Sequence, residues 1–263
     1  MIPKVIHYCW FGGNPYSPLV EKCMDSWKEH LPEYHVQRWD ESNSPIEGCR
    51  FARQAFKEKK WAFVSDYVRL HVLYNEGGIY LDTDMLALKS FDPLLHHKCF
   101  LGLEEPGVAS CGIIGTVRCH VFLHEMLNRY ESLDFDPKQL VPIPARFSDA
   151  LTAKGMTSEN VLQEAFGVHI YPTDCFYPWP GRLHRKQKDF MKFVTSDSYT
   201  VHLWNYSWKS AIEYLRDRQY EEGFPKIWEE IRKNPLQAPV FYKKVITHGT
   251  RFLFQKMFRS IKK

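Results

Sequence analysis

The sequence has no apolar run long enough to span a bilayer. Its opening residues, MIPKVIHYCWFGG, hold too short an apolar stretch and too little flanking charge for a secretory signal. It contains no internal repeat and no low-complexity segment. The net charge of +4 is only mildly basic, so we expect no nucleic-acid partner. We therefore expect a cytoplasmic chain whose 263 residues form one large α/β domain or two small ones.

The sequence also lacks a cysteine pattern typical of disulfides or of a zinc site. The seven cysteines are odd in number, and no two of them have C-x-x-C spacing. Both facts argue against a disulfide framework and against a structural zinc site. The apolar fraction of 44%, with aromatics at 15%, is enough for a full hydrophobic core.

The most informative stretch is residues 61–85, WAFVSDYVRLHVLYNEGGIYLDTDM. Its first part predicts a helix, because apolar residues recur at three- and four-residue spacing. Gly77 and Gly78 can end that helix, since glycine accepts positive φ. Residues 79–81 then form a short β-prone run, which ends at Asp82 and Asp84.

Two aspartates one residue apart point to the same face of an extended chain. Their carboxylates repel each other unless a cation lies between them, and Mg2+ or Mn2+ prefers such oxygen ligands together with substrate phosphates. A solvated acidic turn would show the same short pattern. Here the pair follows a buried strand and a helix that carries Asp66 and Arg69 on one face, which favours a metal–diphosphate site.

Residues 65–85, SDYVRLHVLYNEGGIYLDTDM, resemble the signature of glycosyltransferase family 32. This family includes fungal initiating mannosyltransferases and bacterial capsular-polysaccharide and lipopolysaccharide transferases. The resemblance implies a GT-A fold, which is an α/β domain with a mixed, mostly parallel sheet flanked by helices. It also implies a nucleotide-sugar donor, Mn2+ or Mg2+ as cofactor, and transfer with retention of anomeric configuration. Front-face attack and a covalent intermediate both stay open.

The resemblance also implies roles for individual residues. The family's A-x-x-S-D-x-x-R positions, here residues 62–69, hold the transferred sugar, so we predict that Asp66 and Arg69 contact it. Asp84 would be the principal metal ligand, and Asp82 would bridge ribose, sugar or a metal-bound water. Asp66, Arg69 and Asp82 are thus the predicted catalytic residues, and Tyr80 matches a position near the donor. The alternative is an ordinary i,i+3 ion pair on an exposed helix, worth a few tenths of a kcal/mol.

Trp10 stands at the end of a β-prone run, residues 2–10, which passes into a glycine turn. Ligands of open α/β sheets bind at such strand ends, where an indole can stack on a nucleobase. The residues alone favour an ordinary core tryptophan. However, IHYCWFGG is similar to the family's opening I-H-x-x-W-x-G, which implies that Trp10 binds the base.

Residues 200–208, TVHLWNYSW, form a second informative stretch. Their alternation predicts a strand, and His202 near its end could supply the nitrogen ligand of a Mn2+ site, although a lone histidine is usually structural. The segment resembles the family's late H-x-x-x-x-S-W motif. That resemblance implies that His202 binds the metal and that Ser207 and Trp208 bind the diphosphate, with Asn205 as a further possible ligand.

The last residues, 240–263, contain seven basic side chains and no acidic one. Four apolar residues fall on one helical face: Phe254, Met257, Phe258 and Ile261. We predict a glycosyltransferase domain over residues 1–239, followed by a basic amphipathic tail that binds an anionic membrane surface. The alternative is a terminal helix packed on the domain with a solvated basic face.

These patterns together predict a metal-dependent, retaining hexosyltransferase, peripheral on the inner face of the membrane. It would move a hexose from a UDP- or GDP-sugar to a hydroxyl of a growing, lipid-linked bacterial surface glycan, such as capsule or lipopolysaccharide. Two alternatives are a non-catalytic sugar-binding protein and a D-x-D phosphohydrolase. The phosphohydrolase pattern requires Thr or Val at the position that Leu86 occupies here.

Two local structures are also predicted. Residues 140–147 should form a proline-broken loop, and residues 159–166 should form a helix.

Overall fold

The computed structural model describes residues 1–137, 139–205, 214, 220–233 and 235. The chain divides into two compact units, Met1–Asn205 and Tyr206–Lys263. The second unit contains helix α8 (Tyr220–Lys233). The predicted tail at 240–263, as well as Ser207 and Trp208, lies outside the described residues. Among the helices that are described, none is both long and apolar enough to cross a membrane.

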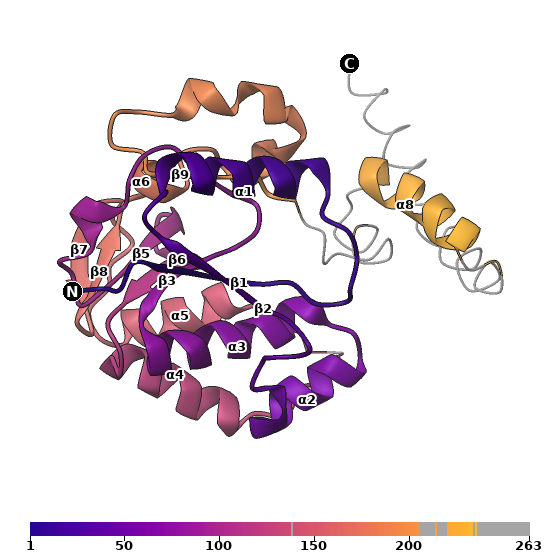
Figure 1. Cartoon of the computed structure of the whole chain (residues 1–263), viewed down its shortest axis with the longest axis horizontal. Helices are drawn as coiled ribbons and strands as arrows, with labels where there is room; N and C mark the ends of the chain where they lie inside the picture. Colours follow the sequence, from indigo (N-terminus) through magenta and orange to yellow (C-terminus); the bar gives the residue numbers. More distant parts are fainter. Residues whose placement is uncertain (138, 206–213, 215–219, 234, 236–263) are drawn as a thin grey trace, which may run out of the picture. The chain divides into compact units, whose positions relative to one another are not determined.

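The first unit is built around a seven-stranded sheet with the order β2-β1-β3-β6-β5-β8-β7 (Figure 1). β6 is antiparallel to β3 and β5, and β7 is antiparallel to β8, whereas the other neighbours pair in parallel. Five strands therefore run in one direction, and only β6 and β7 oppose them. The strands are β1 (Val5–Cys9), β2 (His35–Trp39), β3 (Gly78–Leu81), β5 (Cys99–Glu105), β6 (Val108–Thr116), β7 (Gln163–Ala165) and β8 (Val168–Tyr171).

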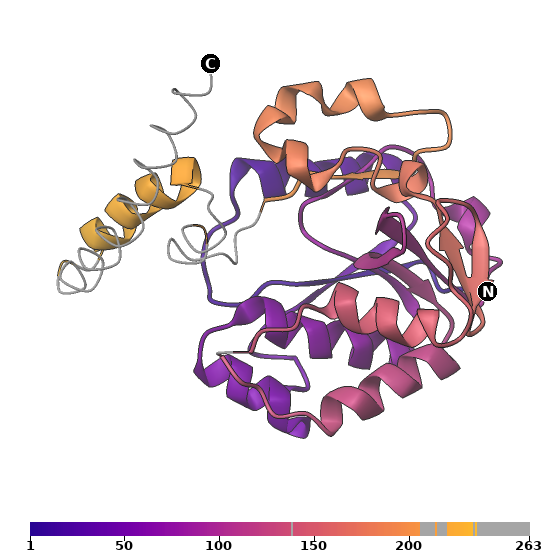
Figure 2. The same ribbon diagram turned by 180° about the vertical axis from the view of Figure 1, so that it is seen from behind.

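Helices cover both faces of this sheet. Figures 1 and 2 show α1 and α6 on one face, and α2, α3, α4 and α5 on the other. The expected fold class, an α/β domain of GT-A type with a mixed, mostly parallel sheet flanked by helices, is thereby confirmed. The helices are α1 (Pro18–His30), α2 (Arg50–Lys57), α3 (Trp61–Glu76), α4 (Val121–Glu131), α5 (Ile143–Thr152) and α6 (Thr173–Phe176), with 3-10 segments at Ile46–Gly48, Asp92–Leu94 and Gly181–Phe193.

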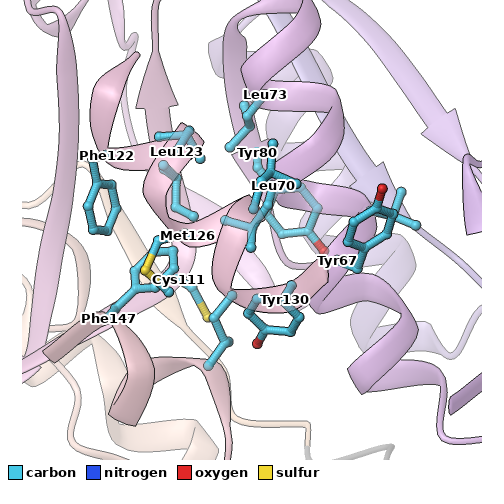
Figure 3. Packing of buried hydrophobic residues seen from close by; sticks show 14 of the residues in the cluster. Tyr67, Leu70, Leu73, Tyr80, Cys111, Phe122, Leu123, Met126, Tyr130 and Phe147 are labelled. Atoms are coloured by element: carbon cyan, nitrogen blue, oxygen red, sulfur yellow. The ribbon is translucent and has the colours of Figure 1, made fainter. Parts of the chain in front are cut away.

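Helix α3 is the central helix of its layer, and most of its residues are buried. Figure 3 shows side chains of α3 and α4, among them Tyr67 and Tyr130, in one cluster with Cys111 of β6 and Phe147 of α5. The helix ends at Glu76, with Gly77 as its C-cap. The next residue, Gly78, has φ +103° and lies so close to β1 that a Cβ would be 2.8 Å from a carbonyl oxygen. The predicted sequence of helix, glycine turn and buried strand is therefore confirmed.

Two local predictions are wrong. Residues 143–147 belong to α5 rather than to a loop, because Pro144 lies in the first turn, where a helix needs no N–H from it. Residues 159–166 do not form a helix. Gln163–Ala165 form strand β7 instead, since antiparallel pairing with β8 at the sheet edge satisfies their backbone.

Candidate functional site

The D-T-D segment forms a tight turn between β3 and β4 (Met85–Ala87). The Met85 amide donates to the Asp82 carbonyl oxygen at 3.0 Å, which closes the turn. The predicted extended geometry is therefore wrong at this point. The turn nevertheless keeps both carboxylates together, because one ligand atom each of Asp82, Asp84 and His202 lies within 4.8 Å of the other two.

Strand pairing brings His202 to this turn across 118 residues. β9 (Thr200–His202) pairs antiparallel with β4, and His202 lies opposite Met85. His202 Nε2 is 3.0 Å from Asp84 Oδ1, and the Asn205 amide donates to Asp84 Oδ2 at 2.8 Å. Both carboxylate oxygens of Asp84 are thus held by the segment that starts with β9.

Charge and burial act together on this pair. Burial works to raise the pKa of the Asp84 carboxyl, but His202 and the Asn205 amide outweigh it and hold that pKa below its ordinary value. Burial likewise works to lower the pKa of His202, and Asp84 raises it instead. Two carboxylates and an imidazole nitrogen at this spacing fit a divalent cation such as Mn2+ or Mg2+. The predicted ligands, Asp84 and His202, and the predicted bridging residue Asp82 are therefore neighbours.

Asp82 is held by contacts with α3 and with strands β3 and β6 of the sheet. Its Oδ1 lies 3.2 Å from an Arg69 guanidinium nitrogen and accepts a hydrogen bond from the Tyr80 hydroxyl, also at 3.2 Å. Its amide donates to the Gly112 carbonyl oxygen at 2.8 Å. A Cβ at Gly112 would lie 3.3 Å from Asp82 Oδ2 and 3.0 Å from the Tyr177 hydroxyl, so any larger residue here would press on both groups.

Arg69 and Asp66 form a buried pair, with 4% and 5% of their surface exposed. The exposed-helix alternative for these two residues is thereby excluded. The guanidinium of Arg69 lies 3.4 Å from Asp66, stacks 4.4 Å above the Tyr80 ring, and donates to the Cys111 carbonyl oxygen at 2.8 Å. Burial works to lower the pKa of Arg69, but Asp82 and the other neighbours raise it well above its ordinary value. Arg69 therefore remains charged and fixes both acidic residues.

The buried Asp66 should make stability depend on pH. Burial raises the pKa of Asp66 to about 7 although Arg69 opposes this. In the unfolded chain an aspartate releases its proton near pH 4, so between pH 4 and 7 the folded state binds more protons. The free energy of unfolding should therefore fall by about 4 kcal/mol as pH rises through this interval. Urea unfolding of the wild type and Asp66→Asn at several pH values measures this, and equal slopes for both proteins would contradict it.

Trp10 follows β1 at the predicted strand end. Its amide donates to the Trp39 carbonyl oxygen, and its indole Nε1 donates to the Asn14 carbonyl oxygen at 2.8 Å. Its ring packs edge-on against Tyr16 at 4.8 Å and remains partly exposed. Nucleobase binding by Trp10 stays a prediction, as do the roles of Ser207 and Trp208.

Sequence reasoning missed two further residues near the turn. Glu104, at the end of β5, accepts a hydrogen bond from the Ser110 hydroxyl at 2.8 Å, and burial raises its pKa. The Tyr177 hydroxyl accepts from the Ile113 amide at 3.0 Å, and its ring lies 5.8 Å from the ring of His202. The sequence offers one signal for Glu104, an acidic residue directly after the β-prone run of residues 100–103.

Comparisons with known proteins agree with these features. Residues 17–101 match a family model described as the glycosyltransferase sugar-binding region containing the DXD motif. The chain is 28% identical over 142 residues to inositol phosphoceramide mannosyltransferase 3 of Schizosaccharomyces pombe, which covers 51% of this chain and 39% of that protein. It is 25% identical over 163 residues to lactosylceramide 4-alpha-galactosyltransferase of Mus musculus, covering 59% of this chain and 44% of that protein. Each match thus spans less than half the length of the relative.

Among solved structures, the PaToxG glycosyltransferase is 21% identical, with a TM-score of 0.48. That match covers 59% of this chain and 69% of the other. The family match includes Asp66, Arg69, Asp82 and Asp84, but neither Trp10 nor His202.

Proposed function

On the premise that this chain is a glycosyltransferase family 32-like protein, we propose that it transfers a hexose from a nucleotide-sugar to a hydroxyl group of a glycan. One observation carries this proposal. The Asp82–Asp84 turn, the strand-borne His202 and the buried Asp66–Arg69 pair converge at one edge of the sheet. Neither a solvated acidic turn nor an exposed ion pair would produce that convergence.

Asp84 and His202, with Asp82 beside them, are the residues that would hold Mn2+ or Mg2+. When bound, such a cation acts as a Lewis acid that offsets the charge developing on the leaving diphosphate. Asn205 keeps Asp84 in place through its backbone amide. Ser207 would bind the diphosphate from the same segment of chain.

The neighbouring residues of α3 would orient the sugar. Asp66 would accept hydrogen bonds from sugar hydroxyls, and Arg69 holds Asp66 and Asp82 at fixed positions, so that the reacting carbon is already aligned. Trp10 would stack on the nucleobase. The Tyr80 hydroxyl donates a hydrogen bond to Asp82 and so helps to hold its carboxylate. Trp208 completes the proposed diphosphate contacts. We also propose retention of anomeric configuration, as the family resemblance implies.

The donor and the acceptor remain parts of the proposal. One relative is named for transfer of mannose and the other for transfer of galactose, so both GDP- and UDP-sugars are candidate donors. Both names specify ceramide-based acceptors, which supports a lipid-linked acceptor. A bacterial capsule or lipopolysaccharide as the product stays a prediction from the sequence, because these two relatives come from a yeast and a mouse.

A lipid-linked acceptor would place the enzyme on the cytoplasmic face of a membrane, held by the basic residues of 240–263. Each basic side chain near an anionic surface contributes about 1 kcal/mol. We expect the chain ending at residue 239 to bind phosphatidylglycerol-containing vesicles at least about tenfold more weakly than the full chain in a sedimentation assay. Pure phosphatidylcholine vesicles serve as the control surface. Equal binding of both proteins would contradict membrane binding by the tail and would favour the alternative, a terminal helix whose basic face is solvated.

A thermal-shift screen tests the proposed function. UDP-, GDP- and CDP-sugars are each added with Mn2+ and with EDTA, and the sugar that stabilises the protein is then tested for release of the nucleoside diphosphate. We expect one nucleotide class to raise Tm only when Mn2+ is present. A shift without any turnover would favour the sugar-binding protein, and hydrolysis of simple phosphate esters would favour the phosphohydrolase. No shift with any nucleotide-sugar would contradict the proposal.

A further inference from the structure

Strand β6 is irregular where it passes the candidate site. Its pairing with β5 changes from Leu101↔Ile114 to Leu103↔Ala109. Two steps along β5 (103 − 101) therefore oppose five steps along β6 (114 − 109), and residues 110–113 form a bulge on the side of β6 that faces β5. On the other side, Ile113 still pairs with Leu81 of β3. Bulges next to active sites commonly redirect side chains or free backbone groups for other partners.

The partners of this bulge are the residues of the site. The Cys111 carbonyl oxygen accepts from Arg69 at 2.8 Å, and the Gly112 carbonyl oxygen accepts from the Asp82 amide at 2.8 Å. The Ser110 hydroxyl, from the same bulge, donates to Glu104 Oε2 at 2.8 Å. One deformed segment thus fixes two residues already assigned to the site and a third that has no role so far.

Glu104 is at the sheet edge that carries the site. β3 and β5 run in the same direction on either side of β6, so their carboxyl ends, with Asp82 and Glu104, lie along one edge. The negative charge of Glu104 is close enough to contribute to the raised pKa of His202, as the charge of Asp82 does. The next residue, Glu105, is exposed and points to the other face of the strand.

Only one of the two carboxylate oxygens of Glu104 accepts a hydrogen bond within the part of the chain that the structure describes. Ser110 satisfies Oε2, and no donor among the described residues lies within hydrogen-bond distance of Oε1. Its side chain is partly buried, and this burial raises the pKa of the carboxyl, which makes the carboxylate more basic. The metal and donor contacts proposed above make no use of it. A carboxylate in this position can accept a proton from a hydroxyl group that enters beside the metal ligands.

We propose that Glu104 is the catalytic base that receives the proton of the incoming acceptor hydroxyl. This inference rests on the proposed function. In the step, the acceptor oxygen forms a bond to the anomeric carbon of the sugar on the face from which the diphosphate leaves, so that configuration is retained, and the bond from that carbon to the diphosphate oxygen breaks. The electron pair of the broken bond leaves with the diphosphate. The acceptor proton moves to Glu104 Oε1 and is lost to water after the product departs.

The test uses water as the acceptor, so the natural acceptor need not be known. Mn2+-dependent hydrolysis of the nucleotide-sugar chosen by the thermal-shift screen is measured for the wild type, Glu104→Gln and Glu105→Gln. Glutamine keeps the shape of the side chain and can still accept from Ser110, so folding should be preserved. We expect Glu104→Gln to lower kcat by about 10²- to 10⁴-fold, with the donor KM and the donor-induced Tm shift unchanged. Glu105→Gln, the matched control, should behave as the wild type.

A second variant separates base catalysis from a structural effect. Glu104→Ala should be as slow as Glu104→Gln, and added formate, a small free carboxylate, should restore part of its turnover. A Glu104→Gln turnover within threefold of the wild type would overturn the inference. Loss of the donor-induced Tm shift in Glu104→Gln would also overturn it, because Glu104 would then belong to the donor site. Absence of both Tm shift and hydrolysis in the wild type would refute the proposed function itself.

Discussion

Replacing Asp84 by alanine is expected to lower Mn2+-dependent donor turnover by about 10³-fold or more. Asp84 is the one residue of the turn whose two carboxylate oxygens are both held by the segment from His202 to Asn205. Its loss removes the proposed metal ligand and the carboxylate that contacts His202 Nε2 at 3.0 Å. The substitution should leave the fold intact, because the β4–β9 pairing and the hydrogen bond from the Leu203 amide to the carbonyl oxygen of residue 84 use only backbone atoms.

Initial rates of nucleoside diphosphate release and the Tm of the ligand-free protein measure these two effects separately. Asp25→Ala is the control, because Asp25 is an exposed acidic residue of α1 whose ion pair with Lys28 lies on the surface. It should leave both quantities unchanged. If Asp84→Ala turned over the donor at more than a third of the wild-type rate, Asp84 would have no essential role in the reaction.

Replacing Arg69 by alanine is expected to cost about 3–5 kcal/mol of unfolding free energy, together with nearly all activity. The change leaves Asp66 and Asp82 without their buried cation, and the Cys111 carbonyl oxygen without its donor. Since a typical domain is stable by only about 5–15 kcal/mol, much of the protein would unfold at moderate urea concentration. Arg69→Lys should recover part of the stability but little activity, because an ammonium group lacks the planar fork that reaches both carboxylates.

Urea unfolding at pH 7 gives the free energies. The matched control is Arg129→Ala, which breaks an exposed i,i+4 ion pair with Glu125 and should cost less than about 1 kcal/mol. If Arg69→Ala and Arg129→Ala had the same small effect, the buried pair would not stabilise the site as described.

The central helix, glycine turn and strand could be predicted from the sequence because every signal there is local. The apolar period defines α3, and Gly78 occupies a backbone position that a Cβ would not fit. The spacing of Asp66 and Arg69 also placed them on one face correctly. Their burial could not be predicted, since it depends on β6, which covers them from residues far along the chain.

Long-range pairing explains the rest of the differences. His202 reaches Asp84 only through the pairing of β4 with β9, and spacing within one segment cannot reveal that register. The family motif, rather than the alternation of residues 200–204, is what predicted a metal role for His202. Glu104 was overlooked because its place depends on a bulge, and a bulge is a property of two paired strands. The same holds for β7, whose residues adopt a strand because β8 lies beside them.

The most direct measurement is the affinity of the full chain for UDP and GDP by titration calorimetry, with Mn2+ and with EDTA, for the wild type and Asp84→Ala. If Asp82, Asp84 and His202 hold a cation that binds the diphosphate, one nucleotide should bind the wild type at least about tenfold more tightly with Mn2+, and Asp84→Ala should lose that difference. An affinity that changes neither with EDTA nor with Asp84→Ala would show that the nucleotide does not bind through this site.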